Sequence, residues 1–272
     1  MDHYAVIGNP VAHSKSPQIH RAFAQATGQA MIYERLLAPL DAFAATVEAF
    51  AAQGGQGLNV TVPFKLQAFA LAHAASDRAL AAGACNTLKR NGDGWYADNT
   101  DGAGIVHDLT QNLGIALCGR DVLVLGAGGA ARGILAPLFA QGPRAVTLCN
   151  RTPAHAEALA TAFAARGPIC AMAPTVLAGQ SFDVVINATS AGLGGDVGLP
   201  WPIGLFRPDA IAYDMIYADG ETTFLRWARE CGAMRCADGL GMLVEQAAES
   251  FMLWRGVRPD TRRVFDMLRP PA

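Results

Sequence analysis

A lysine and an aspartate in two separate polar segments are candidates for proton transfer. Residues 59–65 read Asn-Val-Thr-Val-Pro-Phe-Lys, so polar and apolar side chains alternate until Pro63 ends the predicted strand. Lys65 then falls at a helix start, where the helix dipole disfavours a cation, so its ammonium should lose a proton more readily if it is also partly buried. Asp101 opens another predicted helix, and a carboxylate near Lys65 would moderate that effect. From spacing alone, a solvated surface lysine and an ordinary helix N-cap are the alternatives.

A hydroxyl-rich loop follows the first predicted strand, at residues 11–17. Ser14 and Ser16 stand in this loop, and Pro17 marks a helix start with Ser16 as the predicted N-cap. Two hydroxyls beside a helix amino terminus could hold a small carboxylate. A purely structural cap and an ordinary turn residue are the alternatives for these serines.

A glycine-rich turn indicates a dinucleotide site in the middle of the chain. The apolar run at residues 122–125 is typical of a buried parallel strand, and Gly126-Ala127-Gly128-Gly129 then opens a helix. Glycines let the backbone approach a pyrophosphate, which the free N–H groups and the positive end of the helix dipole attract. Such a turn alone is weak evidence, but the order strand, turn, helix and second strand strengthens it.

The end of the next predicted strand, at residues 145–149, favours NADP over NAD. Sites for NAD usually carry Asp or Glu there to bind the ribose 2′-hydroxyl, whereas this chain has Asn150, Arg151 and Thr152. A cation with amide and hydroxyl groups suits a 2′-phosphate better. A solvated surface cation is the alternative for Arg151.

Composition and charge make several function classes improbable. The 272 residues suffice for two modest domains. The net charge is −2 and the Lys and Arg residues are scattered along the chain, so we expect no binding of nucleic acid or membrane. The absence of an apolar leader and of any long apolar run predicts a soluble cytoplasmic protein. The 6 cysteines and 6 histidines form no ligand pattern, so no metal site is expected.

Alternating strand and helix patterns predict an α/β fold that positions these residues. Strands are expected at residues 4–7, 31–36, 58–62, 86–89, 95–97, 122–125, 145–149, 182–187 and 211–215, and helices at 65–73, 101–112 and 239–254. The pair Asn91-Gly92 predicts a hairpin turn. The last helix carries the apolar stripe Leu243, Ala247 and Phe251, which we expect to pack on the amino-terminal domain.

Taken together, these motifs resemble those of shikimate dehydrogenases, in family order over nearly the whole chain. The resemblance rests on Gly8-Asn9-Pro10, the segments at residues 13–17 and 59–65, Gly83-Ala84-Cys85-Asn86-Thr87, Asn99-Thr100-Asp101-Gly102, residues 126–132, Asn150-Arg151-Thr152, Asn187-Ala188-Thr189-Ser190, and the segments at residues 213–217 and 238–248. It implies a substrate-binding domain of residues 1–102 plus 238–272 and a Rossmann-like NADP-binding domain of residues 103–237. The active site would lie in the cleft between the two.

The resemblance also implies an activity and the residues that serve it. Proteins of this family reversibly reduce 3-dehydroshikimate to shikimate with NADPH, in aromatic amino-acid biosynthesis. The implied catalytic residues are Lys65 and Asp101, and the implied substrate ligands are Ser14, Ser16, Thr61, Asn86, Tyr217 and Gln246. The implied NADP ligands are Gly126, Ala127, Gly128, Gly129, Ala130, Asn150, Arg151, Thr152, His155, Thr189, Met215 and Gly239.

One position departs from the family pattern. Many members carry a second basic residue shortly after the Asn-Arg-Thr block, and His155 stands near that position, so the strength of the NADP preference stays open. The nearest alternative is an enzyme that also oxidises quinate or prefers NAD. A non-catalytic NADPH-binding sensor is a remote alternative, disfavoured by the presence of Lys65 and Asp101. We expect a monomer or homodimer with a small-molecule substrate.

Overall fold

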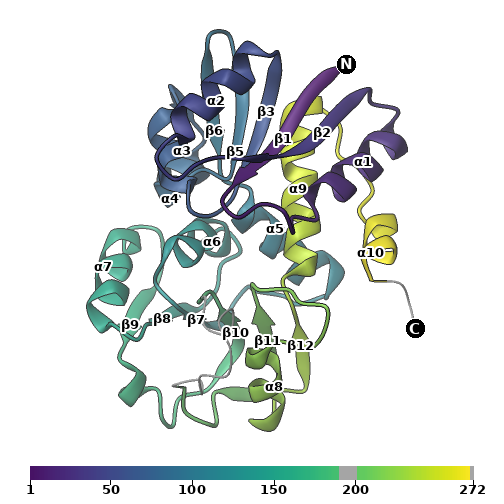
Figure 1. The fold of residues 1–272 in the computed structure, drawn as a ribbon. Helices are drawn as coiled ribbons and strands as arrows, with labels where there is room; N and C mark the ends of the chain where they lie inside the picture. The colour runs from purple at the N-terminus through teal and green to yellow at the C-terminus, as the bar shows by residue number, and fades with distance from the viewer. Residues whose placement is uncertain (190–200, 270–272) are drawn as a thin grey trace. The chain divides into compact units, whose positions relative to one another are not determined.

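The computed structural model describes residues 1–189 and 201–269, which fold into two compact α/β units (Figure 1). The first unit comprises Met1–Gly104 and Leu243–Ala272, and the second comprises Ile105–Met242. The boundaries fall within helices α5 (Asp101–His107) and α9 (Leu240–Arg255). The expected two-domain α/β architecture is confirmed. Across the described residues, no helix is long and apolar enough to span a membrane.

The first unit is built on a mixed sheet with the strand order β2-β1-β3-β5-β6-β4. Its strands are β1 (Asp2–Gly8), β2 (Met31–Leu37), β3 (Gly55–Val60), β4 (Ala74–Ala75), β5 (Thr87–Asn91) and β6 (Gly94–Asp98). Its helices are α1 (Ser16–Thr27), α2 (Phe43–Ala52), α3 (Lys65–Leu71), α4 (Asp77–Ala82) and α10 (Arg262–Leu268), with parts of α5 and α9. Strands β5 and β6 pair antiparallel around the turn that Asn91-Gly92 predicts.

Strand β1 supplies apolar side chains to both faces of this sheet, because successive side chains of a strand point in opposite directions. Ala5 and Ile7 join the core that contains α2 and α3, whereas Tyr4 and Val6 pack with Trp254 of α9. In a separate cluster, the buried residues Ala247 and Phe251 of α9 pack with Ile19 and Phe23 of α1 and Val264 of α10. The expected packing of the last helix on the amino-terminal segment is confirmed.

The second unit contains a parallel sheet with the order β12-β11-β10-β7-β8-β9. Its strands are β7 (Asp121–Leu125), β8 (Ala145–Cys149), β9 (Ile169–Met172), β10 (Phe182–Asn187), β11 (Phe206–Asp214) and β12 (Arg235–Ala237). Its helical elements are α6 (Gly129–Phe139), α7 (Pro153–Phe163), α8 (Thr223–Glu230), a π-helical turn at Asp108–Asn112 and a 3-10 turn at Pro174–Val176. This is the doubly wound order of dinucleotide-binding folds, whose ligands bind where the carboxyl ends of the two central strands diverge, here β7 and β10.

Several predicted boundaries are wrong by a few residues. Helix α1 includes Ser16 and has Lys15 as its N-cap, and the Ser14 hydroxyl accepts the Ser16 N–H at 3.3 Å, so Ser16 is not the capping residue. Strand β3 ends at Val60 because the chain turns next, with the Thr61 carbonyl accepting the N–H of Phe64. The helix expected over 101–112 is α-helical to His107 and then π-helical. Strands β4, β9 and β12 were not predicted, because two to four residues are too few for a clear alternation.

Candidate active site

Lys65 and Asp101 form a close ion pair in the first unit. Each is the first residue of its helix, α3 and α5, and the Lys65 Nζ lies 2.5 Å from the Asp101 Oδ2. The side chains are 30% and 11% exposed, so the pair is partly shielded from water. The second Asp101 oxygen, Oδ1, accepts a hydrogen bond from the Asn86 Nδ2 at 2.8 Å. The aspartate thus accepts one hydrogen bond on each carboxylate oxygen, from Lys65 and from Asn86.

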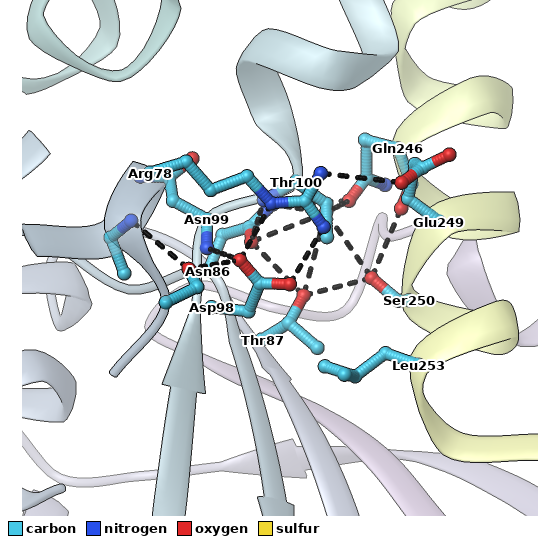
Figure 2. Close-up of polar contacts among 12 residues, drawn as sticks. Arg78, Asn86, Thr87, Asp98, Asn99, Thr100, Gln246, Glu249, Ser250 and Leu253 are labelled. Atoms are coloured by element: carbon cyan, nitrogen blue, oxygen red, sulfur yellow. Dashed lines mark hydrogen bonds and ion pairs between the residues drawn. The ribbon is translucent and has the colours of Figure 1, made fainter. Parts of the chain in front are cut away.

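Two buried amides, Asn86 and Gln246, extend this pair into a cluster; Figure 2 shows the two amides. The Asn86 Oδ1 accepts the backbone N–H of Thr100 at 2.8 Å, which fixes the direction of its amide. The Asn86 Nδ2 also faces the Gln246 Oε1 at 3.2 Å, and the Gln246 Nε2 donates to the Leu243 carbonyl at 2.9 Å. Lys65, Asn86, Asp101 and Gln246 therefore come together from α3, the turn before β5, α5 and α9.

The predicted carboxylate ligands of the first unit lie in the loop between β1 and α1, at the start of α1 and directly after β3. Ser14 is held by Arg35, whose Nη2 donates to the Ser14 carbonyl at 2.6 Å. Ser16 is buried at the start of α1. Thr61 packs closely against Gly8 at the end of β1. A Cβ added at Gly8 would come within 2.3 Å of the Thr61 Cγ2.

Tyr217, the remaining predicted substrate ligand, belongs to the second unit, beyond the end of β11. Its side chain is half-buried, and burial raises the pKa of its phenol, with a further contribution from the charge of Asp219. The phenol therefore keeps its proton at neutral pH and can act as a hydrogen-bond donor.

A buried polar network that the sequence did not predict lies on β3, around Asn59. The Asn59 Oδ1 accepts hydrogen bonds from the Tyr33 hydroxyl at 2.7 Å and from the His20 Nε2 at 3.1 Å. Its Nδ2 donates to the hydroxyls of Ser250 at 2.9 Å and Thr87 at 3.1 Å. Burial lowers the pKa of His20 to about 3, so its ring is neutral. The only sign of this network in the sequence was the alternation of polar and apolar residues in β3. That alternation did not show that other side chains of the protein would occupy both the oxygen and the nitrogen of the Asn59 amide.

The glycine-rich turn lies between β7 and α6 in the second unit. Gly126 has a φ of +108°, and a Cβ there would come within 3.0 Å of the Ala188 carbonyl, so the turn itself requires this glycine. At Gly128 and Gly129, by contrast, a Cβ would meet no protein atom within 4 Å. Both residues and Ala130 are exposed at the start of α6, where no side chain caps the helix. The protein's own packing therefore does not require the second and third glycines, whereas close approach of a pyrophosphate would.

The block Asn150-Arg151-Thr152 follows β8, next to this turn. The Gly126 N–H donates to the Cys149 carbonyl at 2.7 Å, which joins the two strand ends. Arg151 is exposed, and the Asn150 Nδ2 donates to the Thr152 carbonyl at 2.9 Å. Thr152 is the N-cap of α7 but makes no capping hydrogen bond with its side chain, and His155 is exposed in the first turn of that helix.

The other three predicted cofactor residues follow β10, β11 and β12. The Thr189 hydroxyl donates to the Asn187 Oδ1 at 2.7 Å, and the Met215 N–H donates to the Asn187 carbonyl at 3.0 Å. A Cβ at Gly239 would come within 2.3 Å of the Met215 carbonyl oxygen, so this glycine is required by close backbone packing. All twelve predicted NADP ligands thus lie at the carboxyl edge of one parallel sheet or in the helix turns that follow it. Ser190, which ends the motif around Thr189, lies outside the described residues.

Comparison with known proteins places the chain in a family. Three family models match it: the shikimate dehydrogenase substrate binding domain at residues 6–88, shikimate / quinate 5-dehydrogenase at 108–193, and the shikimate 5′-dehydrogenase C-terminal domain at 239–264. A relative from Thioalkalivibrio sulfidiphilus named shikimate dehydrogenase (NADP(+)) is 58% identical over 271 residues, which is 99% of each chain. The chain belongs to the shikimate dehydrogenase family.

Solved structures of similar proteins agree with this family and with the fold. The crystal structure of an Ael1 enzyme from Pseudomonas putida has a TM-score of 0.93 and 48% identity, and the match covers 100% of this chain and 99% of the other. Shikimate 5-dehydrogenase from Thermus thermophilus, in complex with NADP(H) and shikimate, has a TM-score of 0.85 and 35% identity over 96% of each chain. Within the chain, the substrate-binding-domain match contains Lys65 and Asn86, and the dehydrogenase match contains the glycine turn and Arg151.

Proposed function

We propose that this protein catalyses the reversible, NADPH-dependent reduction of 3-dehydroshikimate to shikimate. The observation that carries this proposal is the cluster of Lys65, Asp101, Asn86 and Gln246, which presents a shielded ion pair beside two buried amides in a member of the shikimate dehydrogenase family. Relatives named shikimate dehydrogenase (NADP(+)) support both the substrate and the cofactor.

Lys65 is the proton donor of the proposed reduction. When bound, NADPH supplies the hydride to the carbonyl carbon. The Lys65 Nζ donates a proton to the carbonyl oxygen, which becomes the hydroxyl of shikimate, and accepts that proton in the reverse reaction. Asp101 accepts a hydrogen bond from the Nζ at 2.5 Å and so directs it, and the partly exposed lysine can exchange its proton with water.

Polar groups around this pair would select the substrate. Asn86 and Gln246 would bind ring hydroxyls, because a site whose buried amides need partners discriminates strongly against analogues that lack a hydroxyl. The Gln246 Nε2 now donates to a backbone carbonyl three residues earlier, a local bond that a substrate hydroxyl can replace. Ser14, Ser16, Thr61 and the protonated phenol of Tyr217 would donate to the substrate carboxylate.

The second unit fits NADP at its glycine-rich turn. The space beside Gly128 and Gly129 and the uncapped start of α6 suit a pyrophosphate. At the end of β8, the exposed guanidinium of Arg151 would pair with the 2′-phosphate, and Thr152 and His155 would bind beside it. The strength of this preference depends on His155, which is not a permanent cation.

Initial rates with purified protein test the proposal. Shikimate with NADP should yield NADPH, and the rate with NADP should exceed the rate with NAD. Absence of NADPH formation from shikimate would refute the proposed activity.

Quinate is a second candidate substrate, because the family model matching residues 108–193 describes shikimate / quinate 5-dehydrogenases. A comparison of kcat/KM for the two acids decides between a dedicated and a relaxed enzyme. Location in the cytoplasm and a monomeric or dimeric state stay predictions of the sequence.

A further inference from the structure

A partly buried arginine fork joins α4, β6 and α9 outside the predicted catalytic residues (Figure 2). The Nε and Nη2 of Arg78 donate to the two carboxylate oxygens of Asp98, each at 2.6 Å. The third nitrogen, Nη1, donates to the Glu249 Oε2 at 3.2 Å. The side chain of Asp98 is only 4% exposed, and that of Arg78 is 27% exposed. One guanidinium therefore holds two carboxylates from distant parts of the chain.

The Asp98 end of this fork leads to Asp101 in two steps. The Asp98 Oδ1 accepts the backbone N–H of Asn99 at 2.7 Å and the hydroxyl of Ser76 at 2.5 Å. The buried Asn99 side chain donates to the Ala84 carbonyl at 3.1 Å, and its Oδ1 accepts the N–H of Asp101 at 3.2 Å. The backbone before Asp101 is thus held at two points, the Asn99 N–H by the Asp98 carboxylate and the Asp101 N–H by the Asn99 amide.

The Glu249 end leads to Gln246. These residues are three apart on α9, so their side chains lie on neighbouring positions of one helix face. The Gln246 Oε1 accepts from the Asn86 Nδ2 at 3.2 Å and the Thr100 hydroxyl at 3.3 Å. Glu249 is held on its other oxygen by Arg258. Arg78 thus connects the turn that carries Asp101 with the helix turn that carries Gln246.

Stability alone does not account for such a cluster. Burial of the Asp98 carboxylate has a desolvation cost, and partly exposed ion pairs such as that of Arg78 with Glu249 contribute little to stability. A bidentate guanidinium–carboxylate contact instead fixes the orientation of both partners, which a lysine cannot do. We propose that Arg78 is a positioning residue that sets the geometry of Asp101 and Gln246 for proton transfer. This inference rests on the proposed function.

Two substitutions of Arg78 test the role of the fork. Arg78→Lys keeps the charge but loses the bidentate contact, and Arg78→Met loses both. Because displacement of catalytic groups by about 1 Å can lower a rate by about 10²-fold, we expect kcat to fall by about 10- to 100-fold in both variants. The dissociation constant of NADP should not change. The deuterium isotope effect with NADPH labelled at the transferred hydrogen should equal or exceed that of the wild type, because the loss lies in the chemical step.

Arg255→Met is the matched control. Arg255 lies at the end of α9, in the same unit as Arg78, and donates to Gln29, Asp2 and Tyr4, none of which contacts Asp98 or Gln246. Its loss should lower the melting temperature and leave kcat unchanged. If Arg78→Met does not fold, Arg78→Lys and Glu249→Ala decide the matter, and the latter should give a smaller fall in kcat.

The outcomes separate this inference from the proposed function. An inactive wild type would overturn the proposed function and the inference together. An active wild type whose Arg78 variants lose only melting temperature would overturn the inference alone. A kcat of Arg78→Lys equal to that of the wild type would also overturn the inference, because the positive charge without the bidentate contact would then be sufficient.

Discussion

Substitution of both members of the Lys65–Asp101 pair should be no more damaging than substitution of one. The two side chains are linked by one contact of 2.5 Å, so either single change removes the same ion pair. Lys65→Met keeps most of the aliphatic stem and removes the proton donor. Asp101→Asn keeps the size of the side chain but leaves one acceptor oxygen for two donors, the Lys65 Nζ and the Asn86 Nδ2. One of these donors must then lose its partner.

The expected loss follows from general acid–base catalysis. Each single variant should lower kcat by about 10² to 10⁴, equivalent to about 3 to 5 kcal/mol in the activation free energy. Independent contributions would multiply to about 10⁴ to 10⁸ in the double variant, whereas groups that act as a unit are strongly non-additive. We expect the kcat of the double variant to equal that of the less active single variant, with little change in the KM for NADP.

The assay is a double-mutant cycle of kcat at saturating shikimate and NADP, with thermal unfolding to establish that each variant folds. Lys89→Met is the matched control, because Lys89 lies in the same unit and its Nζ donates to the Leu253 carbonyl at 2.9 Å. Its kcat should equal that of the wild type. A Lys65→Met variant with most of the wild-type turnover would remove Lys65 from the mechanism. Multiplicative effects in the double variant would refute the coupling of the pair.

Three further predictions concern the substrate carboxylate, the cofactor phosphate and acid stability. Ser14→Ala and Tyr217→Phe should each weaken shikimate binding by about 1.5 to 3 kcal/mol and leave NADP binding unchanged, and calorimetry showing full shikimate affinity in both would contradict this placement. Arg151→Ala should weaken NADP binding by about 1.5 to 3 kcal/mol and NAD binding far less, and equal losses in titrations of the two cofactors would rule out a contact with the 2′-phosphate. His20 has a pKa of about 3 in the folded protein, against an ordinary value of 6.5. Between these two pH values the unfolded chain binds a proton at His20 that the folded protein does not bind. The free energy of unfolding should therefore fall as the pH falls below 6.5, by at most about 1.4 kcal/mol per pH unit from this group. Denaturant unfolding of His20→Gln should show a shallower loss over this range, and identical slopes would exclude His20 as a source of acid sensitivity.

Local sequence patterns determined the elements that position the site. A short apolar run followed by Gly126-Ala127-Gly128-Gly129 needs only neighbouring residues to form a strand, a tight turn and a helix start, and the structure has β7 and α6 there. The stripe of Leu243, Ala247 and Phe251 likewise predicted a buried helix face, which α9 has. These patterns carry over because periodicity and backbone freedom act within a few residues.

Tertiary structure alone decided which polar side chains meet. The Asn86 Nδ2 faces the Gln246 Oε1 although 160 residues separate them in the chain, and Asn59 meets Ser250 across 191 residues. Neither contact leaves a periodic trace in the sequence, because each depends on the return of α9 to the first unit. The contacts of Arg78 could not be predicted for the same reason. A single arginine in a short helix does not indicate which two carboxylates it binds, because these are brought to it only when β6 and α9 fold beside α4.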